Sequence, residues 1–106
     1  MLNTAKYLLK NLESYPNESA ISSKGKSGSW ETKTWSEFYD LVQSISKSFI
    51  SLGINKNDKI SIYSYNRIEW NACYLATQLT NSVAVGVYHT SSSEEVEWVV
   101  GNSDSK

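Results

Sequence analysis

Several residue types that would support particular classes of site are scarce in this sequence. There is a single cysteine, Cys73, and a single histidine, His89. One thiol cannot form an intramolecular disulfide and cannot build a zinc site from several cysteines. No run of about 20 apolar residues is present, as a membrane-spanning helix would need. The N-terminus also lacks the apolar run of a signal peptide, so we expect a cytoplasmic protein.

Charge of one sign is not in excess either. The chain has 10 basic and 11 acidic residues. A nucleic-acid-binding face needs clustered basic side chains, and an anionic membrane attracts polybasic segments. Since neither pattern is found, nucleic acid is not an expected partner. Apolar residues make up 40% of the 106 residues and include four tryptophans, which predicts one small folded domain with a core.

The first half of the chain predicts two helices and a β-hairpin. Residues 4–12 have apolar side chains at helical spacing, with Thr4 as the expected N-cap. Residues 19–23 and 30–35 predict the two strands of the hairpin, because a polar, Gly-rich turn separates them. The clearest helical periodicity is found over residues 36–52.

This second helix has sequence signals at both ends. Thr34 and Glu37 have the spacing of a capping box, in which each side chain bonds the backbone of the other residue. Gly53 lies where a helix C-terminus favours a positive φ. The apolar positions that recur at helical spacing are Phe38, Leu41, Val42, Ile45, Phe49 and Leu52.

The second half alternates between strand and helix signals. A strand is predicted over residues 59–65, followed by a helix that begins with Asn66 and Glu69 as a capping box and ends at Asn81. The apolar run over residues 83–88 predicts a strand buried on both faces.

A last helix is predicted to begin at one of three serines and to end at Gly101. The possible N-caps are Ser91, Ser92 and Ser93, and Glu94 and Glu95 suit the positive end of the helix dipole. Its buried face is expected to comprise Val96, Val99 and Val100.

This order of elements predicts an α/β fold with a partial parallel sheet flanked by helices and preceded by a short β-hairpin. Such a unit usually continues into another strand, so we expect an incomplete domain. The sheet edge would be left exposed, and self-association through that edge is one expected consequence.

The residues that could support chemistry are few, and each has an ordinary structural interpretation. Residues 25–27 have the Gly-Lys-Ser order that ends a P-loop, but Ala20 stands where its first glycine belongs, so a turn is favoured. The glutamates near residue 95 are expected to form a solvated face rather than a metal site. Cys73 is expected to be a small core residue rather than a reactive thiol.

Two further residues keep a functional alternative. Arg67 opposes the dipole at a helix N-terminus, so it either belongs to an ordinary helix start or binds a carboxylate or phosphate. His89 follows the apolar strand, at the end of a parallel sheet where ligands often bind. It is either a general base or a loop histidine with ordinary polar contacts, and the second interpretation is favoured. We predict no catalytic residue and no metal site in this chain.

Five motifs resemble, in order and spacing, the N-terminal region of the adenylate-forming acyl-CoA synthetases, and most closely the long-chain fatty acid–CoA ligases. They are Thr34-Trp35-x-Glu37-Phe38, Leu52-Gly53-Ile54, Asp58-Lys59-Ile60-Ser61-Ile62-Tyr63-Ser64, Asn66-Arg67-x-Glu69-Trp70 and Val85-Gly86-Val87-Tyr88-x-Thr90-Ser91-Ser92-x-Glu94-Glu95-Val96. The closing Ser103-Asp104-Ser105-Lys106 is similar to a Ser-x-x-Lys of relatives. The chain departs from many relatives at Asn57 and at His89.

The resemblance implies that residues 1–106 are the N-terminal part of the large AMP-binding domain, with no second domain. It implies a parent enzyme that uses ATP and Mg²⁺ to activate a fatty acid as an acyl-adenylate, which coenzyme A then converts to a thioester. The phosphate loop, adenine pocket and catalytic lysine of relatives lie beyond the matched region, so the chain alone is expected to be inactive. His89 and Thr90 are expected near coenzyme A, and the parent enzyme is expected to be cytoplasmic or peripheral to a membrane.

Two other interpretations remain open. The chain could be a stand-alone, non-catalytic interaction module derived from such an enzyme, which the reading frame after Lys106 would test. It could also be a fragment of a different adenylating enzyme, although the Asn-Arg-x-Glu-Trp motif favours the fatty acid ligases.

Overall fold

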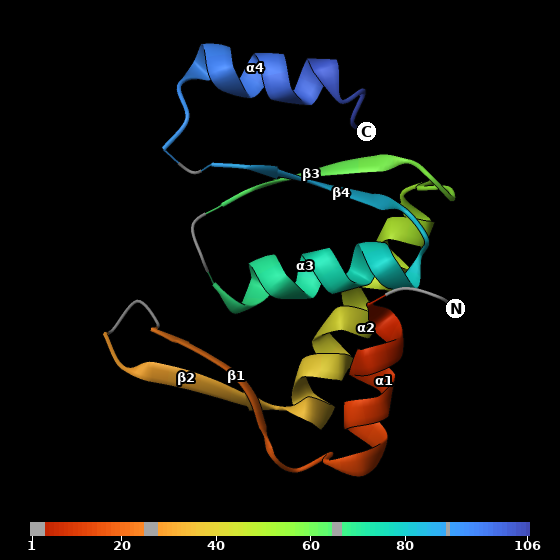
Figure 1. Cartoon of the computed structure of the whole chain (residues 1–106), viewed down its shortest axis with the longest axis vertical. Helices are drawn as coiled ribbons and strands as arrows, with labels where there is room; N and C mark the ends of the chain where they lie inside the picture. Colours follow the sequence, from red (N-terminus) through yellow and green to blue (C-terminus); the bar gives the residue numbers. More distant parts are fainter. Residues whose placement is uncertain (1–3, 25–27, 65–66, 89) are drawn as a thin grey trace.

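The computed structural model describes residues 4–24, 28–64, 67–88 and 90–106, and Figure 1 shows how their elements are arranged. The elements in chain order are α1 (Ala5–Ser14), β1 (Ser19–Lys24), β2 (Trp30–Thr34), α2 (Trp35–Ser51), β3 (Lys59–Tyr63), α3 (Ile68–Leu79), β4 (Val83–Val87) and α4 (Ser93–Asn102). The predicted α/β fold is confirmed, with an antiparallel hairpin first and a parallel pair of strands second.

The hairpin of β1 and β2 leads directly into α2. Its strands pair antiparallel from Lys24 with Trp30 to Ser19 with Thr34. The capping box at the start of α2 is confirmed: the Glu37 N–H donates to Thr34 Oγ1 at 3.2 Å, and the Thr34 N–H donates to Glu37 Oε1 at 2.9 Å. The backbone N–H of Thr34 lowers the pKa of Glu37, because a hydrogen bond to the carboxylate favours its charged form.

Two predicted helix starts have different outcomes. Thr4 was expected to cap α1, and this prediction is wrong, because its side chain makes no capping bond. A capping residue needs an extended backbone to direct its side chain at the first amides, whereas Thr4 has φ −59° and ψ −27°. The predicted cap Asn66 lies outside the described residues, and Arg67 precedes α3 with an extended backbone and no side-chain capping bond.

The parallel strands β3 and β4 form the middle of three layers, with α3 on one face and α4 on the other (Figure 1). Their register pairs Lys59 with Val83 and Tyr63 with Val87. A side chain added at Gly86 would lie 3.7 Å from the Trp70 ring, so Gly86 and its neighbours in register face α3. Alternation along a strand then places Ser61 and Tyr63 on the face of α4.

The face of the β3–β4 sheet that packs against α4 is less well covered than the sequence predicts. Val87 is buried, but Val83 is 43% exposed, so the expected strand buried on both faces is wrong at this end. The expected buried face of α4 is also wrong, since no residue of this helix is buried. A sheet of two strands is too narrow to cover a helix, and the valines of α4 remain at best half-buried.

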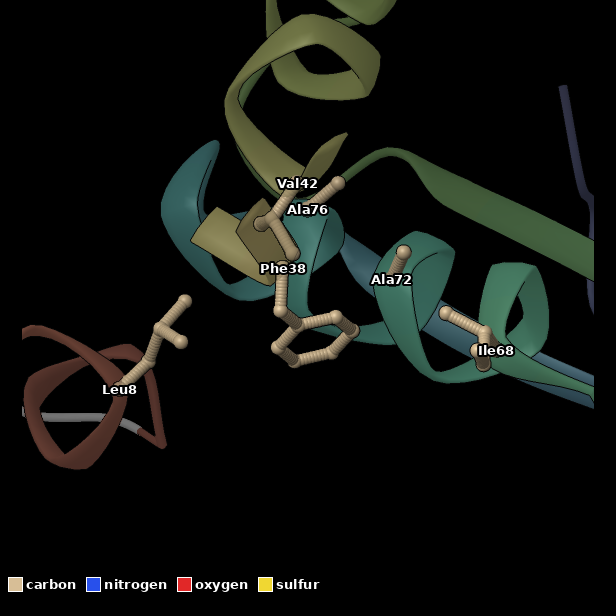
Figure 2. Packing of buried hydrophobic residues seen from close by; sticks show 6 residues of the cluster. All are labelled: Leu8, Phe38, Val42, Ile68, Ala72 and Ala76. Atoms are coloured by element: carbon tan, nitrogen blue, oxygen red, sulfur yellow. The ribbon is translucent and has the colours of Figure 1, made fainter. Parts of the chain in front are cut away.

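The core lies among the helices, on the α3 side of the sheet. Figure 2 shows six buried apolar side chains from α1, α2 and α3 that form one cluster. They are Leu8, Phe38, Val42, Ile68, Ala72 and Ala76. All six residues of this cluster come from three helices. The parallel strands therefore pack beside a core cluster to which they contribute no residue.

The last residues of the chain form an isolated bridge beside β3. Ser105 forms an isolated parallel bridge with Lys59, and the Lys106 N–H donates to the Lys59 carbonyl at 2.8 Å. The hydroxyls of Ser61 and Ser105 are 2.7 Å apart. Since Lys59 also pairs with Val83 of β4, Ser105 lies on the opposite edge of β3.

Candidate functional site at the carboxyl ends of the parallel strands

The carboxyl ends of β3 and β4 are the candidate site, because the chain leaves these two strands toward opposite faces of the sheet. The next element after β3 is α3, which lies below the sheet, and the next element after β4 is α4, which lies above it (Figure 1). The crevice outside two such strand ends is where open α/β sheets commonly bind ligands. The described residues of this edge are 63–64, 67–70, 87–88 and 90–92.

Arg67 is held at this edge by a carboxylate of its own chain. Its Nε lies 2.7 Å from Glu69 Oε2, and both side chains are close to half exposed. This hydrogen bond is the main reason that the pKa of Glu69 is lowered. The guanidinium is therefore already paired, which favours the interpretation of an ordinary helix start over a bound phosphate.

One groove opens on the α3 side of β3. It has a volume of about 380 Å³ and is lined by both apolar and polar residues of β3 and α3, by Phe49 at the end of α2, and by Arg67. Trp70 stacks on Tyr74 with ring centroids 6.2 Å apart, which fixes one wall. Cys73 also lines this groove, and burial raises the pKa of its thiol. This raised pKa favours the expected interpretation of Cys73 as a space-filling residue rather than a reactive thiol.

A second groove lies between β4 and α4. It has a volume of about 410 Å³, and its lining includes Tyr88, Trp98 and Glu95. The two aromatic side chains are 83% and 68% exposed. Glu95 belongs to a second capping box with Ser92, whose Oγ accepts from the Glu95 N–H at 3.3 Å. Of the three serines that could cap α4, Ser92 is the one that does so.

The two residues predicted to lie near coenzyme A belong to the segment between β4 and α4. Thr90 is exposed at this edge, whereas His89 lies outside the described residues. The location of Thr90 agrees with the predicted strand end, and its contact with coenzyme A stays a prediction.

The described part of this edge does not suit ATP and Mg²⁺. Among residues 4–24, 28–64, 67–88 and 90–106, no group of three or more His, Cys, Asp or Glu side chains could hold a metal ion. The cation present within the described edge is Arg67, which Glu69 already pairs. Phosphate binding uses several backbone amides or cations together, so we derive no catalytic step from these residues.

Residues 8–106 match the family model described as AMP-binding enzyme. The chain belongs to this family. Among curated AMP-binding relatives, it is 34% identical over 92 residues to a long-chain-fatty-acid–CoA ligase of Mus musculus, an alignment that covers 86% of this chain and 13% of the mouse protein. It is 34% identical over 77 residues to a long-chain-fatty-acid–CoA ligase of Mycobacterium bovis, covering 73% of this chain and 13% of that protein.

A solved structure shares the fold. A fatty acyl CoA synthetase of Mycobacterium tuberculosis superimposes with a TM-score of 0.88 at 21% identity, covering 98% of this chain and 20% of that chain. This likeness confirms the arrangement of helices and strands. The chain spans about an eighth of the length of the two curated ligases.

Sequence reasoning missed two features of this edge. The Arg67–Glu69 pair was missed because residues two apart do not face each other on a helix, and here Arg67 has an extended backbone before the helix begins. The exposed pair Tyr88 and Trp98 was missed because it joins a strand end to a helix. No local pattern in the sequence signals either arrangement.

Proposed function

We propose that this chain is the N-terminal part of the AMP-binding domain of a long-chain fatty acid–CoA ligase and that it is catalytically inactive alone. In the whole enzyme, ATP and Mg²⁺ would activate a fatty acid as an acyl-adenylate, and coenzyme A would then displace AMP. The match over residues 8–106 to an AMP-binding family, together with 34% identity to a long-chain-fatty-acid–CoA ligase, is the observation that carries this proposal.

The geometry of the described edge supports the inactive part of the proposal. Among the described residues, no group of three or more His, Cys, Asp or Glu side chains could hold a metal ion, and Arg67 at the carboxyl ends of the strands is paired with Glu69. Tight binding of ATP, Mg²⁺ or coenzyme A to this chain alone is therefore not expected.

In the whole enzyme we place His89 and Thr90 near coenzyme A, and we propose a cytoplasmic or peripheral membrane location. No helix within the described ranges is long and apolar enough to cross a membrane.

Exchange of labelled pyrophosphate into ATP tests the proposal, because adenylate formation is reversible. We expect no fatty-acid-dependent exchange above background with the purified 106-residue chain. A full-length ligase such as the mouse relative is the positive control, and heat-denatured chain is the negative control. Fatty-acid-dependent exchange by the chain, at a rate that scales with its concentration, would contradict the proposed inactivity.

A stand-alone interaction module is the second candidate, and the partly paired edge of β3 favours it. Such a module would bind a partner or a second copy through this edge and would catalyse nothing. A stop codon directly after Lys106 in the coding sequence would support the module, whereas continuation into a Thr/Ser/Gly-rich loop would support the ligase. If the parent is a different adenylating enzyme, a panel of carboxylic acids tested on the full-length parent will show a preference for another acid.

A further inference from the structure

The groove between β4 and α4 is bordered by two exposed aromatic rings, on the face of the sheet opposite α3 (Figure 1). Tyr88 follows β4, Trp98 belongs to α4, and both rings are mostly exposed. Trp98 also lines an adjoining hollow of about 460 Å³, together with Gly101 and Asn102. A Cβ added at Gly101 would meet no atom within 4 Å, so the helix surface beside the Trp98 ring is open within the described part of the chain.

Carboxylates border the same ring. Glu94 precedes Trp98 by four residues, so the two side chains are neighbours on one face of α4. Glu94 lines both hollows, and Glu97 lines the second. Glu95 also lines the groove, but its Oε1 already accepts from Ser92 Oγ at 3.0 Å. Within the described residues, no ion pair or hydrogen bond engages the carboxylates of Glu94 and Glu97. A hollow bordered by charge of one sign attracts ligands of the opposite charge.

Another exposed tryptophan of the chain shows how a cation meets such a ring. Trp30 in β2 is 67% exposed, and Lys24 Nζ lies 5.6 Å from its ring centroid. A cation over the face of an indole is attracted by the negative charge of that face. Among the described residues, no lysine or arginine lies over Trp98 or lines its two hollows. Trp98 therefore offers an equally exposed ring with carboxylates beside it, and the described chain supplies no cation to it.

We propose that the groove between β4 and α4 binds an arginine-containing segment of a partner protein. The guanidinium stacks on the Trp98 ring and donates to the carboxylate of Glu94, while Glu97 adds to the attraction. Arginine fits this site better than lysine, because its planar group stacks on an aromatic face and also pairs with a carboxylate. An apolar side chain next to the arginine contacts Tyr88. This binding is separate from the coenzyme A contact proposed for Thr90, since the carboxylates repel phosphate groups.

Two peptides that differ in charge test the site. One is acetyl-Gly-Leu-Arg-Gly-Leu-Arg-Gly-amide, and the other carries citrulline, which has nearly the same shape but no charge, in place of both arginines. Each is titrated into the ¹⁵N-labelled 106-residue chain, and the Gly101 amide and Trp98 indole resonances are followed by NMR. We expect both resonances to shift, with at least fivefold higher affinity for the arginine peptide. Equal affinities, or no shift with either peptide, would overturn the proposal.

Substitution of one tryptophan at a time locates the binding. Trp98→Leu keeps an apolar side chain and removes the aromatic face, so it should weaken the arginine peptide at least fivefold, as measured at the Gly101 amide. Trp30→Leu is the matched control, because it removes an equally exposed indole outside the groove, and it should leave the affinity unchanged. Circular dichroism in urea shows that both variants are folded. Equal losses in the two variants, or no loss with Trp98→Leu, would contradict the assigned site.

Neutralising the acidic border tests the role of charge. The double variant Glu94→Gln, Glu97→Gln keeps the shape of the groove and should weaken the arginine peptide at least threefold. Glu13→Gln, at an exposed position of α1, is the control for the change in net charge. Added salt should weaken binding to the original chain more than to the double variant, because salt screens exposed charges. Undiminished affinity in the double variant would overturn the proposed pairing.

Two further measurements distinguish other occupants of the groove. Excess coenzyme A should leave the affinity for the arginine peptide unchanged, and displacement of the peptide would show that the groove binds this anionic cofactor instead. A second copy of the chain would dissociate on dilution. The Trp98 indole resonance of the chain alone should therefore be the same across a hundredfold dilution. A resonance that moves on dilution would overturn the proposed partner and would assign the groove to self-association.

Discussion

Cys73 lies in the groove beneath β3, where its chemistry depends on burial. The thiolate is the reactive form of cysteine, and an apolar environment disfavours that charged form. Burial is the largest cause of the raised pKa of Cys73, and the charge of Glu69 raises it further. The thiol is therefore expected to be protonated at neutral pH, as befits a side chain that fills space.

We predict that folded Cys73 reacts slowly with iodoacetamide at pH 7.5, at least threefold more slowly than the same chain in concentrated urea. The rate should rise as the pH is increased beyond the ordinary range of a cysteine pKa, because the thiolate population then grows. Mass spectrometry of quenched samples measures the modified fraction over time. Equal rates for folded and unfolded chain at pH 7.5 would show that burial does not control this thiol.

Residues whose partners are close in sequence were the easiest to predict. The box of Thr34 with Glu37 follows from a three-residue spacing and is confirmed. Thr4 and Arg67 show the limit of such reasoning, because their roles depend on backbone angles that the residue type does not determine. Thr4 has a helical backbone and makes no cap, while Arg67 has an extended backbone and reaches Glu69.

At the scale of the elements, the end of α2 depends on one glycine. Gly53 has φ 88°, a conformation that costs a residue with a Cβ roughly 1–2 kcal/mol. Gly101 in α4 is the matched control, because its φ is not in the left-handed region and an added Cβ meets no atom within 4 Å.

We predict opposite effects for the same substitution at these two glycines. Gly53→Ala should lower the free energy of unfolding by about 1–2 kcal/mol because of the left-handed backbone. Gly101→Ala should raise it by about 0.5 kcal/mol, since alanine has the better helix propensity. Urea denaturation followed by circular dichroism measures both changes as shifts of the midpoint. A stabilising Gly53→Ala would contradict the assigned helix end.

The type and order of the elements were predictable, whereas their burial was not. Alternating and helical periodicities identify the apolar side of a strand or helix, and all eight elements were found in this way. Periodicity does not show whether another element covers that side. Val83 of β4 and the valines of α4 therefore remained more exposed than predicted, because the two-stranded sheet presents too little surface.

At the scale of the whole molecule, the family could be predicted from motifs but the site could not. The motifs at the ends of β3 and β4 resemble the acyl-CoA synthetases because they occur together in a fixed order. The site could not be predicted because the chain covers only 13% of the mouse ligase, and no motif at these strand ends carries a catalytic group by itself. The structure thus shows the shapes of the two grooves beside α3 and α4, while the contact of His89 and Thr90 with coenzyme A stays a prediction.

The two sheets differ in how much chain separates their partners, which has a consequence for the order of folding. Lys24 pairs with Trp30 across a short turn, whereas Lys59 pairs with Val83 across the whole of α3. Contacts between distant residues form later, because a longer loop must be closed first. In quenched-flow exchange labelling, we expect hairpin amides to be protected before those of β3 and β4. Simultaneous protection would contradict this order.

The core cluster has a related consequence for synthesis on the ribosome. Its last member along the chain is Ala76, which precedes β4 and α4. Chains are made from the N-terminus and begin to fold as they emerge. The three helices can therefore assemble their apolar cluster before β4 has emerged from the ribosome, and the parallel strands are then added to a surface that already exists.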